Sequence, residues 1–164
     1  MIVVGIDPGI ATTGIGIVSE FDGKYEGLYI GCIKTDKKLC APDRLFEIYN
    51  RIGDIISKFS PDHLAIEQIF FNVNSKTAFS VGESRGVIIL AAREKGLEIF
   101  EYTPLEVKLA VVGYGRAEKV QIQKMVQKLL KLDNPPYPDD AADALAIAIC
   151  HINSYKMKSL LKDK

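Results

Sequence analysis

Four acidic residues stand where their carboxylates could act together on a metal ion. Asp7 follows the short apolar run 2–6, and Glu67 follows a second such run later in the chain. Asp140 and Asp143 are three positions apart, so they would share one face of a helix. Each alone has an ordinary interpretation, as a turn former, a solvated strand end or a helix cap. If the strands that end in Asp7 and Glu67 are neighbours, all four carboxylates converge.

The chemistry of such a cluster follows from its charge. Each acidic residue adjoins a run apolar enough to be buried, and buried like charges require a counter-charge. Oxygen ligands without nearby His or Cys favour Mg²⁺ or Mn²⁺ over Zn²⁺. A carboxylate cluster that holds two such ions cleaves phosphodiester bonds by in-line displacement. The residues therefore predict a metal-dependent hydrolase with two Mg²⁺ ions, for which Mn²⁺ can substitute.

The elements that must position these carboxylates alternate in type after an initial meander. β-rich runs at 2–6, 14–21 and 25–35 predict three strands, with a hairpin turn at Asp22-Gly23. Apolar residues at helical spacing predict a helix over 43–59. The further predicted elements are strands 63–66 and 97–102 and helices over 76–95, 104–112, 117–132 and from 139 onward. This order predicts an α/β fold, a mixed β-sheet with helices on both faces.

Length and composition favour a single domain. The chain has 164 residues, of which 48% are hydrophobic, and it shows no internal repeat or linker. We expect one nuclease domain over 1–156 and a short basic tail over 157–164. The three cysteines have no CxxC spacing, which disfavours a disulfide framework or a zinc module and favours the cytoplasm. No apolar run is long enough to span a membrane.

The charge balance excludes a globally basic nucleic-acid binder. Lys plus Arg and Asp plus Glu both total 21, so a polyanion must be held by a local patch. Segment 104–131 is a candidate, because its basic residues outnumber its acidic ones. The basic residues are Lys108, Arg116, Lys119, Lys124, Lys128 and Lys131, and the acidic ones are Glu106 and Glu118. The last three lysines fit a solvated helix face equally well.

Several blocks together resemble one family, the RuvC Holliday junction resolvases. The blocks are GIDPG, TGIGIV, AIEQIFF with a downstream Asn74, VVGYGRAEK and DDAADALAIAICH, in family order across almost the whole chain. The resemblance implies a ribonuclease H-like fold, a homodimer and magnesium-dependent symmetric nicking of four-way DNA junctions in homologous recombination and DNA repair. It carries the family's catalytic and metal-binding carboxylates over to Asp7, Glu67, Asp140 and Asp143.

The same resemblance suggests how DNA and partners would be bound. Lys108 and Lys119 align with basic residues of the family's DNA-binding surface, and Arg116 is a further candidate. Phe70 could stack on unpaired bases at a junction centre. Asp139 has no counterpart and is expected to be a helix cap or an outer group of the site. By resemblance, the partner complex is the RuvA-RuvB branch-migration machinery.

Other functions remain open from the sequence. A non-catalytic junction-binding or scaffold protein could keep the fold, although all four carboxylates are present. GIDPG also resembles the phosphate loop of actin-like sugar kinases, so a small phosphotransfer fragment is an alternative, although the chain is too short for two lobes. A nuclease of single-stranded or RNA substrates would use the same metal chemistry.

Overall fold

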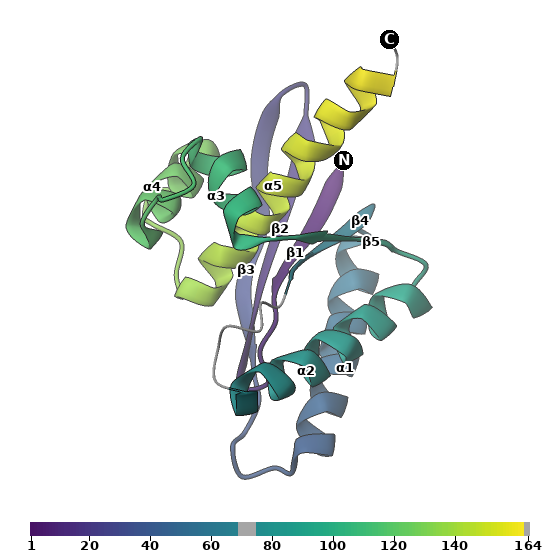
Figure 1. Ribbon diagram of the computed structural model, residues 1–164. Helices are drawn as coiled ribbons and strands as arrows, with labels where there is room; N and C mark the ends of the chain where they lie inside the picture. Colours follow the sequence, from purple (N-terminus) through teal and green to yellow (C-terminus); the bar gives the residue numbers. More distant parts are fainter. Residues whose placement is uncertain (69–74, 163–164) are drawn as a thin grey trace.

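A five-stranded mixed sheet forms the centre of the protein, with helices on both faces (Figure 1). The computed structural model describes residues 1–68 and 75–162, without the side chains of 75–77, 156 and 158–162. The strand order across the sheet is β3-β2-β1-β4-β5. The elements are β1 (Ile2–Asp7), β2 (Thr12–Phe21), β3 (Lys24–Lys34), α1 (Ala41–Phe59), β4 (His63–Glu67), α2 (Ser75–Glu94), β5 (Glu98–Tyr102), α3 (Pro104–Val112), α4 (Lys119–Leu129) and α5 (Asp139–Lys162). The predicted fold class is confirmed.

The first three strands form the predicted antiparallel meander. β2 pairs antiparallel with both β1 and β3. The hairpin between β2 and β3 turns at Asp22 and Gly23, whose φ angles of 50° and 76° are both positive. Two consecutive positive φ angles are what a type I′ turn requires, and Asn or Asp before Gly supplies them at the lowest cost.

Strands β1 and β4 are neighbours and run parallel, which meets the condition for the four carboxylates to converge. Ile6 lies beside Ile66 in the ladder, and β5 continues the parallel half of the sheet. Asp7 and Glu67 are the next residues of the two strands, so both end at the same edge. Adjacent strands lie about 4.8 Å apart, which sets the scale of the separation between their backbones.

The alternation of side chains along β1 and β4 decides which face each carboxylate occupies. Val4 and Ile6 belong to the core beneath α1 and α2, whereas Val3 packs on the opposite face. Two residues along from Gly5, Asp7 therefore faces the side of Val3. β4 follows the same rule, because Ala65 packs on the side of Val3. Both carboxylates are thus directed to the face that α3, α4 and α5 cover.

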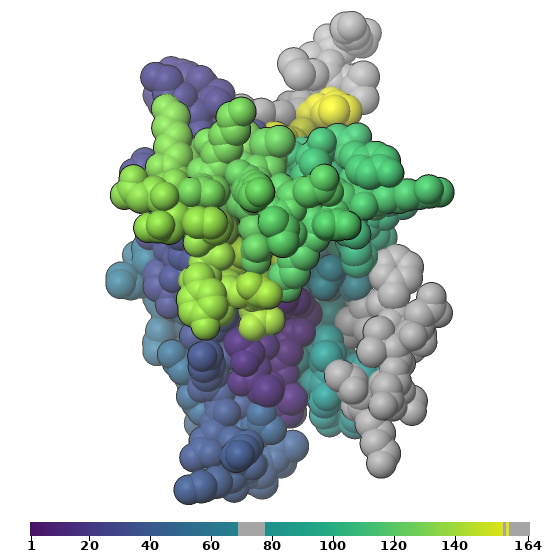
Figure 2. All heavy atoms as spheres, turned by 90° about the vertical axis from the view of Figure 1, so that its left-hand side faces the viewer, coloured from purple at the N-terminus to yellow at the C-terminus, as the bar shows by residue number. Residues whose placement is uncertain are grey.

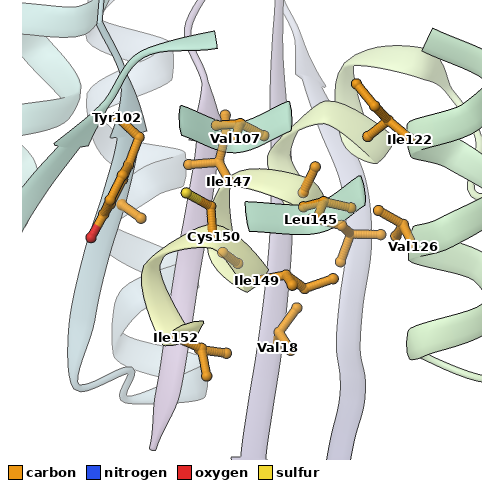
Figure 3. Packing of buried hydrophobic residues seen from close by; sticks show 14 of the residues in the cluster. Val18, Tyr102, Val107, Ile122, Val126, Leu145, Ile147, Ile149, Cys150 and Ile152 are labelled. Atoms are coloured by element: carbon orange, nitrogen blue, oxygen red, sulfur yellow. The ribbon is translucent and has the colours of Figure 1, made fainter. Parts of the chain in front are cut away.

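Each face of the sheet has its own hydrophobic core. On one face, α5 packs directly on the sheet and α3 and α4 pack over it, with Leu145, Ile147 and Ile149 fully buried (Figure 3). On the other face, Ile48 and Ile52 of α1 are covered in the same way. The buried stretch 144–152 confirms that the apolar terminal helix lies against the sheet.

Glycines of β1 and β2 allow α5 to approach the sheet very closely. A Cβ atom at Gly5 would stand 2.0 Å from the carbonyl oxygen of Ala144, and one at Gly14 would stand 2.0 Å from the carbonyl oxygen of Asp140. Neither separation is possible for a real side chain, so the backbones meet only because both residues lack Cβ. Gly14 is also the ladder partner of Asp7. The first turn of α5 is therefore placed directly beside Asp7.

Two sequence expectations meet details that differ or stay open. The helix expected over 117–132 is shorter, because Lys131 adopts a positive φ of 52° just after α4 ends. α5 continues to Lys162 and crosses the expected boundary at 156, and the division into domain and tail stays a prediction. No helix in the described part of the chain is long and apolar enough to cross a membrane.

Substituting Gly14 by Ala should displace the first turn of α5. The added methyl group would clash with backbone, which cannot move aside as a flexible side chain can, and overpacking of this kind costs about 1–3 kcal/mol. We expect a lower melting temperature, measured by thermal unfolding. Gly53→Ala in α1 is the control, since its Cβ would only reach Lys95 at 3.7 Å. An unchanged melting temperature for Gly14→Ala would contradict the close approach.

Candidate active site

Asp7 occupies the end of the central strand, and the loop that follows it is fixed. The hydroxyl of Thr13 donates a hydrogen bond of 2.7 Å to the carbonyl oxygen of Gly9, which closes the turn between β1 and β2. Thr13 itself is fully buried. The loop therefore returns the chain directly into β2 and leaves Asp7 at the bottom of the site.

Glu67 ends the neighbouring strand, and its backbone is held on the far side by β5. Tyr102 is its ladder partner, and the N–H of Gln68 donates a 2.9 Å hydrogen bond to the carbonyl oxygen of Tyr102. The β4–β5 pairing thus continues one residue past Glu67. This carboxylate starts from an ordered strand end.

Asp140 and Asp143 lie in the first turns of α5, where sequence spacing predicts a shared helix face. The backbone of Asp140 is placed by Gly14, and the buried neighbours Ala141, Ala142 and Ala144 anchor this turn to the protein. Acidic side chains near a helix N-terminus also interact favourably with the helix dipole. The buried alanine face and the glycine contact together fix where the two carboxylates begin.

Lys119, the first residue of α4, provides the cation of the site. Its Nζ lies 2.9 Å from Oδ2 of Asp143 and 3.4 Å from Oδ2 of Asp139. Asp139 also accepts a 3.0 Å hydrogen bond from Nε2 of Gln123, four residues along α4 from Lys119. Asp139 therefore links α4 to α5 at the rim of the site, where its own side chain is exposed.

The electrostatics show that the four carboxylates are close enough to influence one another. Burial, together with the charges of Glu67, Asp143 and Asp140, raises the pKa of Asp7 from an ordinary 3.8 to about 7, although the charge of Lys119 acts to lower it. Burial also raises the pKa of Glu67 and of Asp143, the latter in spite of its bond to Lys119. Such an accumulation of unfavourable negative charge is typical of a site that binds cations.

Lys119 responds to the same charges in the opposite sense. Partial burial lowers the pKa of Lys119, but its hydrogen bonds to Asp143 and Asp139 and their negative charges outweigh this effect, so that its pKa is raised. The ammonium group is therefore a stable counter-ion of the cluster.

A hollow of about 190 Å³ opens beside the carboxylates. Glu67, Asp143, Lys108 and Lys119 contribute its polar lining. The remainder of its wall is apolar and comes from α3, α4 and α5, with Pro104, Val107, Ile122, Ala146 and Ile147. Lys108 is thus brought to the same opening as Glu67, although the two residues lie on different elements. Figure 2 looks onto the side of the molecule where α4 (green) and the start of α5 (yellow-green) lie above the end of β1 (purple).

The donor set fits a hard divalent cation, although the side chains do not enclose one as they stand. Among the described residues, no three Asp, Glu, His or Cys side chains are close enough to hold a metal ion. The cluster instead offers carboxylate oxygens from three elements, with the ammonium group of Lys119 as a positive charge within it. All-oxygen donors of this kind are those that Mg²⁺ and Mn²⁺ prefer.

The other residues singled out from the sequence are placed differently. Arg116 is exposed in the loop before α4, and nothing in the described residues connects it to the carboxylates. Phe70 and Phe71, like Asn74, lie outside the described residues. Sequence reasoning missed Gln123, whose i, i+4 spacing from Lys119 on α4 could have indicated it.

Comparisons with known proteins agree on one family. Residues 3–151 match the family described as crossover junction endodeoxyribonuclease RuvC. A protein of that name from Alkaliphilus metalliredigens is 54% identical over 164 residues, covering 100% of both chains. Another, from Ruminiclostridium cellulolyticum, is 53% identical over 161 residues, covering 98% of this chain and 97% of the relative.

Solved structures agree with the sequence comparisons. The structure described as Thermus thermophilus RuvC in complex with Holliday junction substrate superposes with a TM-score of 0.92 at 36% identity and covers 96% of each chain. A second structure, described as Thermus thermophilus RuvC structure, gives a TM-score of 0.90 at 37% identity, covering 96% of this chain and 97% of that one. The yeast mitochondrial resolvase Ydc2 shares the fold, with a TM-score of 0.68 at 16% identity over 92% of this chain and 77% of that one.

The fold is therefore that of the ribonuclease H-like resolvases, a class of DNA nucleases. More narrowly, the chain belongs to the RuvC family of crossover junction endodeoxyribonucleases. The predicted family, fold and enzyme class are confirmed. The assignment of individual residues to catalysis, metal binding and DNA binding stays a prediction.

Without divalent metal ions, the protein should lose stability as pH rises from about 4 to about 7. In this window the folded protein retains the proton of Asp7, whereas the unfolded chain has released it, so the folded state binds more protons and its free energy of unfolding decreases with pH. Asp7→Asn removes this titration and should flatten the dependence. Thermal melts across this pH range in a chelator measure both slopes.

The control for this experiment is Asp54→Asn, which changes an exposed carboxylate on α1. It should keep the native slope. The raised pKa values of Glu67 and Asp143 leave Asp7→Asn with a weaker slope of the same sign. If the melting temperature of Asp7→Asn depended on pH as steeply as that of the native protein, the pKa of Asp7 would not be raised as described above.

Proposed function

We propose that the protein resolves four-way DNA junctions by cutting two strands symmetrically, through hydrolysis of phosphodiester bonds at the carboxylate cluster. The observation that supports this most directly is the convergence of Asp7, Glu67, Asp140 and Asp143 at one end of the sheet, where burial and the charges of the other three carboxylates raise the pKa of Asp7. Its relative from Thermus thermophilus has been solved with a Holliday junction, and its backbone matches this chain along almost its whole length.

The four carboxylates would hold two Mg²⁺ ions, or Mn²⁺ in their place. When bound, these ions supply activation of the attacking water and charge stabilisation of the leaving oxygen. Asp7 belongs to the central strand and is influenced by all three other carboxylates, so its carboxylate would contribute to metal binding from the strand side. Asp140 and Asp143 contribute from the helix side, and Glu67 contributes from the neighbouring strand.

Lys119 and Lys108 would bind and orient the DNA backbone at the cutting position. Both line the hollow beside Glu67 and Asp143, where a scissile phosphate would enter. The ammonium group of Lys119 already compensates acidic charge there. If Asp143 bound a metal ion in place of Lys119, the ammonium group of Lys119 would be released to contact a phosphate of the DNA. Arg116, exposed before α4, would contact the DNA further from the cluster, and Phe70 would stack on a base at the junction centre.

Symmetric cutting requires two related active sites, so we propose a homodimer. Helix α2 offers a surface for it, with Phe79 and Leu90 among its exposed large apolar side chains. Of the small residues on this helix, Ala91 and Ala92 are buried within the chain, whereas Gly86 is exposed with open space beside it. We further propose a cytoplasmic location, consistent with three free cysteines, and the RuvA-RuvB complex as partner.

Of the alternatives, the family membership favours the nuclease. A scaffold that lost catalysis would have no reason to keep Asp7, Glu67 and Asp143, whose carboxylates ionise less readily because they are buried close to like charges. A phosphotransfer fragment is disfavoured because this chain matches RuvC proteins over the full length of both. Preference for junctions over single-stranded or RNA substrates is the part of the proposal that needs a direct comparison of substrates.

Asp7→Asn, Glu67→Gln, Asp140→Asn and Asp143→Asn should each abolish cleavage and leave junction binding largely intact. Each substitution removes a metal ligand but adds no obstacle to DNA. Cleavage and binding of a synthetic four-way junction are measured with and without Mg²⁺, against a plain duplex of the same sequence. Asp54→Asn should cut as the native protein does. Native cleavage of the duplex at the rate of the junction would contradict the proposed selectivity.

Lys108→Ala and Lys119→Ala should weaken junction binding and make it less dependent on salt. Each lysine that neutralises one phosphate contributes about 0.9 to the slope of log K against log salt concentration. Titrations at several salt concentrations measure these slopes with a catalytically inactive Asp7→Asn background. Lys95→Ala, an exposed lysine beyond α2 on the opposite face, should leave the slope unchanged. Unchanged slopes for Lys108 and Lys119 would remove them from the DNA interface.

A further inference from the structure

Arg85, in the middle of α2, reaches the end of the strand that carries Glu67. Its guanidinium Nη2 lies 2.6 Å from Oε1 of Glu101, and its Nε donates a 3.4 Å hydrogen bond to the backbone carbonyl oxygen of Glu67. The Arg85 side chain is only 18% exposed, whereas that of Glu101 is 43% exposed. One guanidinium group therefore touches the last residue of β4 and the next-to-last residue of β5.

The two contacts have different roles. An ion pair with a half-exposed partner contributes little to stability, so Glu101 does not hold the fold together. It does fix the plane of the guanidinium, because Arg presents its donors in a rigid fork. With Nη2 bound to Glu101, Nε is directed at the carbonyl of Glu67. The ion pair thus orients the group that holds the Glu67 backbone.

A contact that holds the Glu67 carbonyl also restricts movement of the Glu67 Cα atom, from which the side chain projects. Glu67 is the last residue of β4. The hydrogen bond from the N–H of Gln68 to the carbonyl oxygen of Tyr102 is the last bond between β4 and β5 among the described residues. The backbone bond to Tyr102 secures the strand end on the β5 side, and the Arg85 side chain adds a contact at the Glu67 carbonyl, where strand ends otherwise open most readily. The Arg85 contact acts at this carbonyl group, and a displacement of the Glu67 backbone here would move its carboxylate relative to Asp7.

We propose that Arg85 is a positioning residue for the nuclease reaction: it holds the backbone of Glu67 from α2 so that the carboxylate keeps its place in the cluster. The proposal rests on the junction-cutting function proposed above. It acts through geometry, since the pKa shift of Glu67 derives from burial, Asp143 and Lys119. It also connects α2, the helix we propose for the dimer interface, to one carboxylate of the active site.

Two conservative variants separate the two contacts of Arg85. In Arg85→Lys the ammonium can still pair with Glu101, but a methylene group replaces Nε and the bond to Glu67 is lost. In Glu101→Gln the ion pair is removed, but Nε of Arg85 remains in place to bond Glu67. In Glu101→Gln the amide oxygen can still accept a hydrogen bond from Nη2 of Arg85, and in Arg85→Lys the positive charge keeps its partner, so both variants should fold, and thermal melts check this.

Cleavage of a four-way junction under single-turnover, saturating conditions provides the first measurement. Arg85→Lys should cut about tenfold more slowly or worse, since small displacements of a catalytic group have large effects on rate, while its affinity for the junction stays native. Glu101→Gln should stay within about threefold of the native rate. Equal losses in both variants, or a native rate for Arg85→Lys, would overturn the proposal.

Hydrogen exchange of the Gln68 amide provides a second measurement that does not depend on activity. This amide bonds to Tyr102 directly after Glu67, so its protection reports the closure of the strand end. Arg85→Lys should exchange it about tenfold faster than the native protein, and Glu101→Gln should not. If the native protein fails to cut junctions but Gln68 responds as expected, the proposed function is wrong, whereas the hold of Arg85 on the Glu67 backbone is supported. Native exchange in Arg85→Lys overturns the positioning role itself.

Discussion

The contact between α5 and the glycines of β1 and β2 is the constraint on which the active site depends. Helix axes normally pack on sheets at the distance that two layers of side chains impose. Here Gly5 and Gly14 remove one layer, and the backbone of α5 lies against the backbone of the sheet. The apolar residues of α5 that follow are fully buried, so the helix is held by its middle while its acidic first turns overhang the end of β1. Asp140 and Asp143 reach Asp7 only under this condition.

This arrangement brings like charges together at the expense of folding. Burial raises the pKa of Asp7, Glu67 and Asp143, so the folded chain resists ionisation of the groups that the reaction needs as anions. Lys119 offsets part of this unfavourable energy through Asp143 and Asp139. Burial of apolar side chains in the hydrophobic cores on both faces of the sheet offsets the remaining unfavourable energy of the site. A site of this type is stable because of its surroundings and reactive because of its charges.

Much of this could be predicted from the sequence because it depends on short-range patterns. The Asp22-Gly23 turn, the helical periodicity of α1 and the short β-rich run of β1 are local properties, and the element that each indicates was predicted correctly. The adjacency of β1 and β4 could be stated only as a condition, because strand neighbours depend on long-range pairing. The contacts of Lys119 with Asp139 and Asp143 were not predicted, since they join α4 to α5 through the angle at which the two helices meet.

The alternation of β1 and β4 also bears on how such a chain can change during evolution. Exchange of one apolar residue for another in these strands alters packing by degrees and leaves every side chain on its own face. Insertion or loss of a single residue between Gly5 and Asp7 would instead rotate the carboxylate to the α1 side of the sheet. These strands therefore tolerate apolar substitutions. Insertions and deletions are tolerated only in the connections between strands, such as the hairpin turn at Asp22 and Gly23.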